Sequence, residues 1–266
     1  MSVGLIIEKC RADNRAALIG YLPVGFPSVE GSITAMKVLV ESGVDIIEIG
    51  VPYSDPVMDG PVIQDAAVRA LARGVRLGDI FTAAREVSGA GAGALVMTYW
   101  NPVLRYGVER FATDLAAAGG AGLITPDLIP DEAGEWIAAA DAHDLDKVFL
   151  VAPSSTPERL AAVTSQCRGF VYATAVMGVT GARASVGEAA DALVSRTREH
   201  TDLPVCVGLG VSTGDQAAEV GRYADGVIVG SALVRCLTEA DSEEQGLEAL
   251  GALARELADG VRRGRS

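Results

Sequence analysis

Glu48 is the residue of this sequence with the clearest potential for acid–base chemistry. It lies near the end of residues 45–50, a run in which half of the residues are isoleucine. Such a run is typical of a strand that is buried on both faces. A carboxylate there is costly unless it is paired or used, and burial raises its pKa toward the range that suits a general acid and base. We interpret Glu48 as a catalytic candidate; the alternative is a structural glutamate paired with a buried hydroxyl or an arginine.

Asp59 is a second carboxylate candidate, eleven positions further along the chain. Pro52, Pro56 and Pro61 keep the intervening segment from forming regular structure, so we expect an ordered loop that holds Asp59 after the strand. An aspartate before a glycine is also a common turn former. On spacing alone, turn formation is the better interpretation of Asp59.

Glycine-bearing turns follow the last three expected strands, at residues 178–181, 208–212 and 230–231. Barrels commonly hold a phosphate where the loops after strands seven and eight meet a helix N-terminus. Each turn alone is a weak signal, because glycine is frequent in tight turns. Their combination predicts an anion site at the ends of these strands.

The sequence offers few histidines that could bind a metal and few lysines that could form an iminium with a substrate. The sequence has two histidines, both in polar helical stretches, and no His-Cys-carboxylate set with zinc-ligand spacing. Lys9 and Lys37 lie on expected helices, and Lys147 opens the fifth expected strand, at the end opposite a catalytic mouth. We therefore expect neither a metal nor a cofactor.

The charge balance limits the possible partners. The chain of 266 residues carries a formal net charge of −13, and it has no basic stripe for nucleic acid or an anionic membrane. A small anion remains possible, because backbone N–H groups bind anions without lysine or arginine. The start of the chain has no signal-peptide pattern, and no apolar run is long enough for a membrane span. We expect a cytoplasmic protein whose four cysteines are reduced thiols.

The elements that must position these residues follow a strand–helix alternation. Eight apolar runs end in turns and are followed by amphipathic stretches; they are residues 16–21, 45–50, 94–99, 122–126, 147–151, 169–175, 204–209 and 226–229. This alternation predicts a parallel sheet, and the length suits a single (β/α)8 barrel domain over residues 1–266. Helices at 2–13 and 61–73 fall outside the eightfold pattern, as an N-terminal helix and an insertion after strand two. Expected N-caps are Ser28, Asp131, Thr156 and Ser212.

Nearly end to end, the chain resembles the tryptophan synthase alpha subunit family, whose fold is a TIM barrel. The resemblance is densest in residues 48–56 with 59–61, 178–182, 208–211 and 230–232. It implies a lyase of tryptophan biosynthesis that cleaves indole-3-glycerol phosphate to indole and glyceraldehyde 3-phosphate. It also implies a pyridoxal-phosphate beta subunit as partner in an α2β2 complex. Asn101-Pro102 and the loops at 55–58 and 178–184 are candidates for that interface.

The resemblance assigns roles to individual residues. Glu48 matches the acid and base that handles the side-chain hydroxyl proton and the proton delivered to indole C3. Asp59 matches the carboxylate that binds the indole N–H, and Tyr172 an active-site tyrosine near Glu48. Phosphate-binding positions are matched by Gly181, Gly210, Gly230 and Ser231. Substrate-pocket or mobile-loop positions are matched by Tyr21, Tyr99, Thr180 and Leu209.

A few positions depart from the commonest family pattern: Tyr21, Phe26, Val176 and Met177. They leave the implied catalytic set intact and concern loop closure and partner contact. An aldol cleavage without lysine or metal needs an electron sink in the substrate, and a C3-protonated indole is one. The alternatives are another phosphate-binding barrel, such as indole-3-glycerol phosphate synthase or ribulose-phosphate epimerase, a non-catalytic regulatory subunit, and a stand-alone indole producer.

Overall fold

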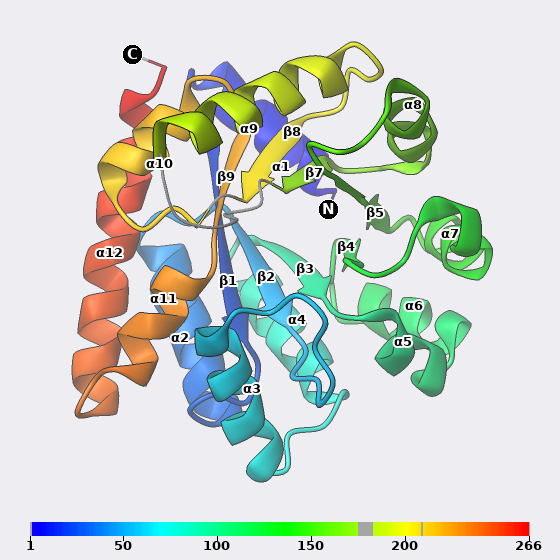
Figure 1. The fold of residues 1–266 in the computed structure, drawn as a ribbon. Helices are drawn as coiled ribbons and strands as arrows, with labels where there is room; N and C mark the ends of the chain where they lie inside the picture. Colours follow the sequence, from blue (N-terminus) through cyan, green and yellow to red (C-terminus); the bar gives the residue numbers. More distant parts are fainter. Residues whose placement is uncertain (1, 175–182, 209, 266) are drawn as a thin grey trace.

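The computed structural model describes residues 2–174, 183–208 and 210–265, with the side chains of 183–186 left aside (Figure 1). Its strands are β1 Ala17–Pro23, β2 Ile46–Gly50, β3 Gly93–Met97, β4 Gly122–Ile124, β5 Asp146–Val148, β6 Leu150–Val151, β7 Val171–Thr174, β8 Val205–Gly208 and β9 Gly226–Val229. The paired strands are all parallel, in the order β5-β4-β3-β2-β1-β9-β8-β7-β6.

The two ends of this order are consecutive pieces of the expected fifth strand. β5 pairs with β4, and β6, one residue later, pairs with β7. The fifth strand therefore closes the ring. It is interrupted at Phe149, so that one expected run forms two short strands. This confirms the (β/α)8 barrel expected from the sequence. Each of the other seven runs overlaps one strand, whose ends lie within two residues of the expected ends.

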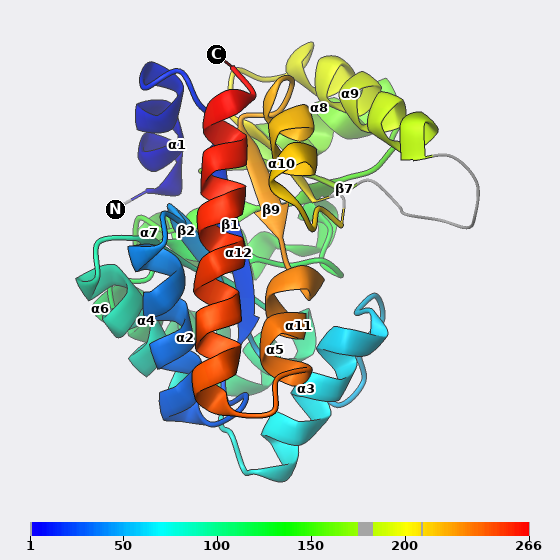
Figure 2. The same ribbon diagram turned by 90° about the vertical axis from the view of Figure 1, so that its left-hand side faces the viewer.

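Helices surround the ring. They are α1 Val3–Ala12, α2 Val29–Glu41, α3 Pro61–Ala72, α4 Asp79–Gly89, α5 Trp100–Tyr106, α6 Val108–Ala117, α7 Gly134–Ala142, α8 Pro157–Gln166, α9 Arg183–Arg198, α10 Gly214–Gly221, α11 Ser231–Thr238 and α12 Glu243–Arg263, with a 3-10 turn η1 at Pro130–Glu132. α1 and α3 confirm the two expected additions to the eightfold pattern. Figure 2 shows them at opposite ends of the molecule, with α12 running along its side between α2 and α11.

Two of the four expected helix caps are present. The hydroxyls of Ser28 and Thr156 accept hydrogen bonds from the Gly31 and Arg159 amides. The prediction for Asp131 was wrong, because this residue lies inside η1, and α7 begins after Ala133 without a side-chain cap. The prediction for Ser212 was wrong by one residue, since Thr213 caps α10; both residues can form local hydrogen bonds, and sequence alone does not separate them.

The buried apolar side chains form two clusters. The larger fills the layer between strands and helices, and the smaller fills the barrel interior. The interior cluster includes Ile46, Leu95, Ile124 and Ile228 from the strands, together with Val3 and Ile7 from α1. Burying those two α1 side chains contributes roughly 1.5–3 kcal/mol each. α1 therefore closes the amino end of the barrel and leaves the carboxyl end for a site.

Buried carboxylates fix the closed end. Asp146 of β5 accepts hydrogen bonds from the Ser2 hydroxyl and the Val3 amide, at 2.9 and 2.7 Å. Asp225, which precedes β9, is 1% exposed and forms ion pairs with Arg11, Arg198 and Arg265. These contacts tie α1, α9 and the end of the chain to the same edge of the sheet. Among the described residues, no helix combines the length and the apolarity that crossing a bilayer requires.

Candidate active site

Glu48 lies in the middle of β2, with Tyr21 of β1 and Leu95 of β3 as its neighbours in register. It shares a side with Ile46, which belongs to the interior cluster, so its carboxylate is inside the barrel. The residue is 1% exposed, and its Oε1 atom has no hydrogen-bond partner within the described parts of the chain. Burial raises the pKa of Glu48 to about 8. At neutral pH the group is therefore held mostly as a neutral acid, ready to donate a proton.

Two buried tyrosines accompany Glu48. Tyr21 crosses Gly50, where an added Cβ would lie 2.2 Å from the Tyr21 hydroxyl oxygen. Tyr172 of β7 crosses Gly208 in the same way, at 2.6 Å. Burial, followed by the charges of Asp59 and Glu48, raises the pKa of Tyr21, and burial and the Glu48 charge raise that of Tyr172. Both hydroxyls therefore stay protonated. The two tyrosine rings fit into these positions because Gly50 and Gly208 have no side chains.

Asp59 lies in the loop between β2 and α3, partly buried. Burial raises its pKa, and a hydrogen bond from the Tyr99 hydroxyl partly opposes this shift. Tyr99 is the residue before α5, and its hydroxyl oxygen accepts a hydrogen bond from the Met58 amide at 3.1 Å. The Asp59 charge in turn raises the pKa of Tyr21. The loop thus brings Asp59 to the same end of the barrel as Glu48, next to Tyr21 and Tyr99.

Gly210, Gly230 and Ser231 lie just beyond the carboxyl ends of two neighbouring strands. Gly208 of β8 pairs with Ile228 of β9. Gly210 comes two residues after Gly208, and Gly230 comes two residues after Ile228, so the two glycines leave the sheet at the same level. Gly230 precedes α11 and Ser231 begins it. An added Cβ at Gly230 would lie 3.6 Å from Tyr21 Cβ, which puts this helix start beside the Glu48 region. Gly230 has no side chain with which to cap the helix, and a helix start whose N–H groups are not capped in this way suits an anion.

The expected residues Thr180, Gly181 and Leu209 lie outside the described part of the chain. The other expected residues lie at one end of the barrel: Tyr21, Glu48, Asp59, Tyr99, Tyr172, Gly210, Gly230 and Ser231. Sequence reasoning missed Gly50 and Gly208 as the positions that make room for the tyrosine rings. Glycine inside an otherwise β-branched strand was the available signal. It also missed the bond between Met58 and Tyr99, for which no sequence signal exists.

The lysine that the sequence placed in a strand, Lys147, does not belong to this group of candidate residues. Lys147 is in β5 and forms an ion pair with Asp141 of α7. Within the described ranges, no three histidine, cysteine, aspartate or glutamate residues are grouped so as to hold a metal ion.

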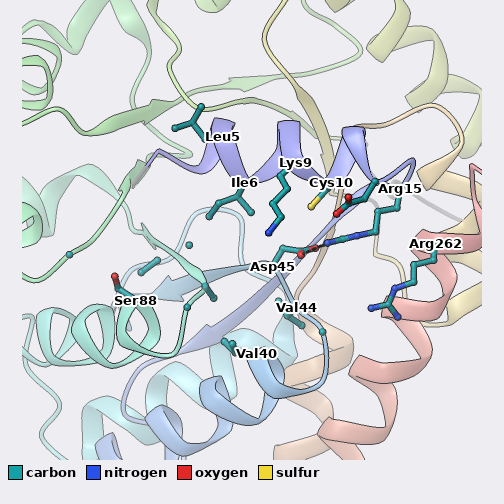
Figure 3. Close-up of a pocket in the computed structure, with 17 residues that line it drawn as sticks. Leu5, Ile6, Lys9, Cys10, Arg15, Val40, Val44, Asp45, Ser88 and Arg262 are labelled. Atoms are coloured by element: carbon teal, nitrogen blue, oxygen red, sulfur yellow. Dashed lines mark hydrogen bonds and ion pairs between the residues drawn. The ribbon is translucent and has the colours of Figure 1, made fainter.

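A separate hollow of about 590 Å³ lies at the opposite end, beneath α1 (Figure 3). Lys9 of α1 points into it, and Arg15 holds Asp45 through two hydrogen bonds of 2.7 and 2.8 Å. Its lining contains none of the candidate catalytic residues. The size of this hollow therefore does not identify the reactive end of the barrel; the buried carboxylate does.

Comparison with known proteins agrees with this geometry. The family model described as "Tryptophan synthase alpha chain" matches residues 7–262. The tryptophan synthase alpha chain of Mycobacteroides abscessus is 63% identical over 258 residues, which cover 97% of this chain and 96% of that one. A structure of Mycobacterium tuberculosis tryptophan synthase superposes with a TM-score of 0.91 at 62% identity, covering 98% of both chains. The alpha subunit from Legionella pneumophila superposes with a TM-score of 0.89 at 32% identity, again covering 98% of both chains. The chain therefore belongs to the tryptophan synthase alpha chain family, the lyases that cleave indole-3-glycerol phosphate in tryptophan biosynthesis.

Proposed function

We propose that Glu48 is the acid and base, and Asp59 the indole-binding carboxylate, with which this chain cleaves indole-3-glycerol phosphate. The observation that carries the proposal is a glutamate buried inside the barrel, with an oxygen that has no hydrogen-bond partner among the described residues and a pKa raised to about 8. A protonated carboxyl of this kind donates a proton at neutral pH and, once ionised, accepts one.

The proposed reaction uses this property twice. Glu48 donates its proton to indole C3, and Asp59 accepts a hydrogen bond from the indole N–H and stabilises the positive charge that forms on the ring. The Glu48 carboxylate then takes the proton of the side-chain hydroxyl. The C–C bond breaks, its electron pair neutralises the ring, and the hydroxyl carbon becomes the aldehyde of glyceraldehyde 3-phosphate. One proton is given and one is recovered, so the enzyme ends as it began.

Binding of the substrate phosphate is proposed for Gly210, Gly230 and Ser231, with Gly181 from outside the described part of the chain. The open start of α11 beside Tyr21 supports this assignment. Backbone N–H groups there would bind a dianion in spite of the chain's negative charge. Tyr21, Tyr99 and Tyr172 are proposed to line the indole pocket, with Thr180 and Leu209.

The partner is proposed to be the beta subunit, in an α2β2 complex. Exposed apolar side chains on the segments that follow β2, β3 and β4 support a docking face at the barrel mouth: Val57, Met58, Leu104 and Ile129. We also propose that the chain acts as one unit over residues 1–266, because one ring of strands runs from β1 to β9 and α12 packs back against α2. A cytoplasmic location is proposed because a phosphate ester such as the substrate does not cross membranes unaided.

An indole-release assay tests the reaction. Asp59→Asn keeps the size of the side chain but removes its charge, so we expect indole release to fall roughly 100-fold or more. Release by this variant at the wild-type rate would contradict the role of Asp59.

A binding measurement tests the docking face. Met58→Asp introduces a charge at the proposed interface, and we expect it to weaken binding of the beta subunit, measured by calorimetry, roughly tenfold or more. Leu5→Asp is the matched control, because Leu5 is an exposed apolar residue of α1 at the closed end. Equal effects of the two substitutions would contradict the assignment of this face.

A further inference from the structure

The loop that carries Asp59 is attached to the start of α5 at two points. Near its beginning, the Tyr53 ring packs on the Tyr99 ring, with centroids 5.4 Å apart. The Tyr53 hydroxyl also accepts a hydrogen bond from Asn101 at 3.1 Å. Near its end, the Met58 amide donates to the Tyr99 hydroxyl at 3.1 Å. Tyr99 takes part in both attachments.

The start of α5 is itself anchored. The Trp100 amide donates to the two carboxylate oxygens of Asp127, at 2.9 and 3.2 Å. Asp127 follows β4, the strand next to β3 in the ring. The point at which Tyr99 leaves the sheet is therefore set by two strands, whereas the Asp59 loop contains no regular structure between β2 and α3. Tyr99 is a rigid support beside a segment that has little support of its own.

The loop changes direction at the bond to Tyr99. Val57 and Met58 are 81% and 51% exposed, whereas Asp59 is partly buried and turned toward Tyr21 and Tyr99. Since the Tyr99 oxygen accepts a hydrogen from Met58, its own hydrogen is free to be donated. The Asp59 carboxylate is near enough for its charge to raise the pKa of Tyr99. The Tyr99 hydroxyl thus holds the main chain at Met58, where the loop changes direction toward Asp59.

We propose that Tyr99 is a positioning residue for Asp59: by holding the amide of Met58, the residue before Asp59, the Tyr99 hydroxyl sets the direction in which the Asp59 carboxylate points. The inference rests on the proposed role of Asp59 and adds a role for Tyr99 beyond lining a pocket. Tyr99 acts through Asp59 and takes no proton from the substrate. The main-chain oxygen of Asp59 is held separately, by the Gln64 amide of α3 at 2.8 Å, so the loop as a whole remains attached without Tyr99.

The Tyr99 hydroxyl also affects how the Asp59 carboxyl ionises. Within the described residues, the titratable groups facing Asp59 are Tyr21 from β1 and Tyr99 before α5. Tyr21 and Tyr99 both stay neutral, because their pKa values are raised, and of these two groups it is Tyr99 that lowers the pKa of Asp59. Loss of its hydroxyl leaves burial unopposed. The pKa of Asp59 should then rise, and a smaller fraction would be ionised at neutral pH.

Tyr99→Phe and Tyr53→Phe form a matched pair for the test. Each removes one hydroxyl from a stacked ring, but the Tyr53 hydroxyl bonds Asn101 at the beginning of the loop, whereas the Tyr99 hydroxyl bonds Met58 beside Asp59. The first measurement is a carbon-13 NMR titration of the Asp59 carboxyl in the full chain, assigned with Asp59→Asn. The second is the pH profile of kcat/KM for indole release.

We expect Tyr99→Phe to move the Asp59 titration and the acidic limb of the profile to higher pH, and to lower kcat/KM at neutral pH roughly tenfold or more. Tyr53→Phe should leave both within a factor of two of the wild type. An unchanged Asp59 titration in Tyr99→Phe, or an equal shift in Tyr53→Phe, would overturn the proposal. A wild-type chain that releases no indole would instead count against the proposed function, and the titration would still test the role of Tyr99.

Discussion

Replacement of Glu48 by glutamine is expected to make the protein more stable at alkaline pH. Glutamine has nearly the same shape but no charge to bury. In the wild type, the folded state holds the Glu48 proton up to a pKa of about 8, whereas the unfolded chain releases it near the ordinary value of 4.5. Between these values the folded state binds more protons than the unfolded state, so wild-type stability falls as the pH rises. The variant has no such loss.

The size of the effect follows from the interval between the two pKa values. At about 1.4 kcal/mol per pH unit, an interval of about 3.5 units corresponds to ~5 kcal/mol in the free energy of unfolding. The difference between variant and wild type should be absent below about pH 4.5, grow between about pH 5 and 8, and level off above about pH 8. Glu48 is buried, and one of its oxygens has no hydrogen-bond partner in the part of the chain that the structure describes; such a group lowers stability where function requires it.

Urea unfolding followed by circular dichroism, from pH 5 to pH 9, measures this difference. Subtraction of the wild-type curve cancels the titration of all other groups. Glu86→Gln is the control, because Glu86 is a half-buried glutamate whose pKa the Lys37 ammonium holds below its usual value. It should show no stabilisation at alkaline pH. Stability curves for Glu48→Gln and wild type that run parallel from pH 5 to pH 9 would refute the argument that Glu48 is buried as an acid.

Three further substitutions test other parts of the structure. Gly50→Ala would place a methyl group 2.2 Å from the Tyr21 hydroxyl oxygen, so indole release should fall roughly 100-fold while the fold persists; full activity would contradict the tight contact. Gly230→Asp brings a negative charge to the proposed phosphate site and should weaken binding of glycerol phosphate roughly tenfold or more, with Gly230→Asn weakening it less; unchanged affinity in a titration would count against that site. Asp225→Asn removes the buried charge that three arginines share, and should lower the free energy of unfolding by roughly 3–5 kcal/mol in urea; a loss below about 1 kcal/mol would show that the network contributes little.

The fold could be predicted from the sequence to a large extent, because its signals are local. Apolar runs such as residues 226–229 coincide with a strand, and a cap such as Ser28 coincides with a helix start. The interruption of the fifth strand at Phe149 could not be predicted. It depends on how that strand divides its pairing between β4 and β7, which flank it on its two sides only in the closed ring.

The site could be predicted only in part. Glu48 stands out because a charge in an apolar strand is conspicuous in any sequence. Asp59 could not be separated from a turn former without the family resemblance, because its burial and its contact with Tyr99 arise from the folded loop. The bond between Met58 and Tyr99 joins residues 41 positions apart, and the packing of Tyr21 on Gly50 crosses two strands. Such contacts depend on the path of the whole chain.

Indole release from indole-3-glycerol phosphate by Glu48→Gln, compared with the wild type, tests the central assignment most directly. With a urea unfolding curve and a glycerol phosphate titration to establish that the variant is folded and binds ligand, the account predicts a loss of roughly 100- to 10,000-fold in the rate of indole formation. A folded variant that binds ligand and forms indole at the wild-type rate would contradict it.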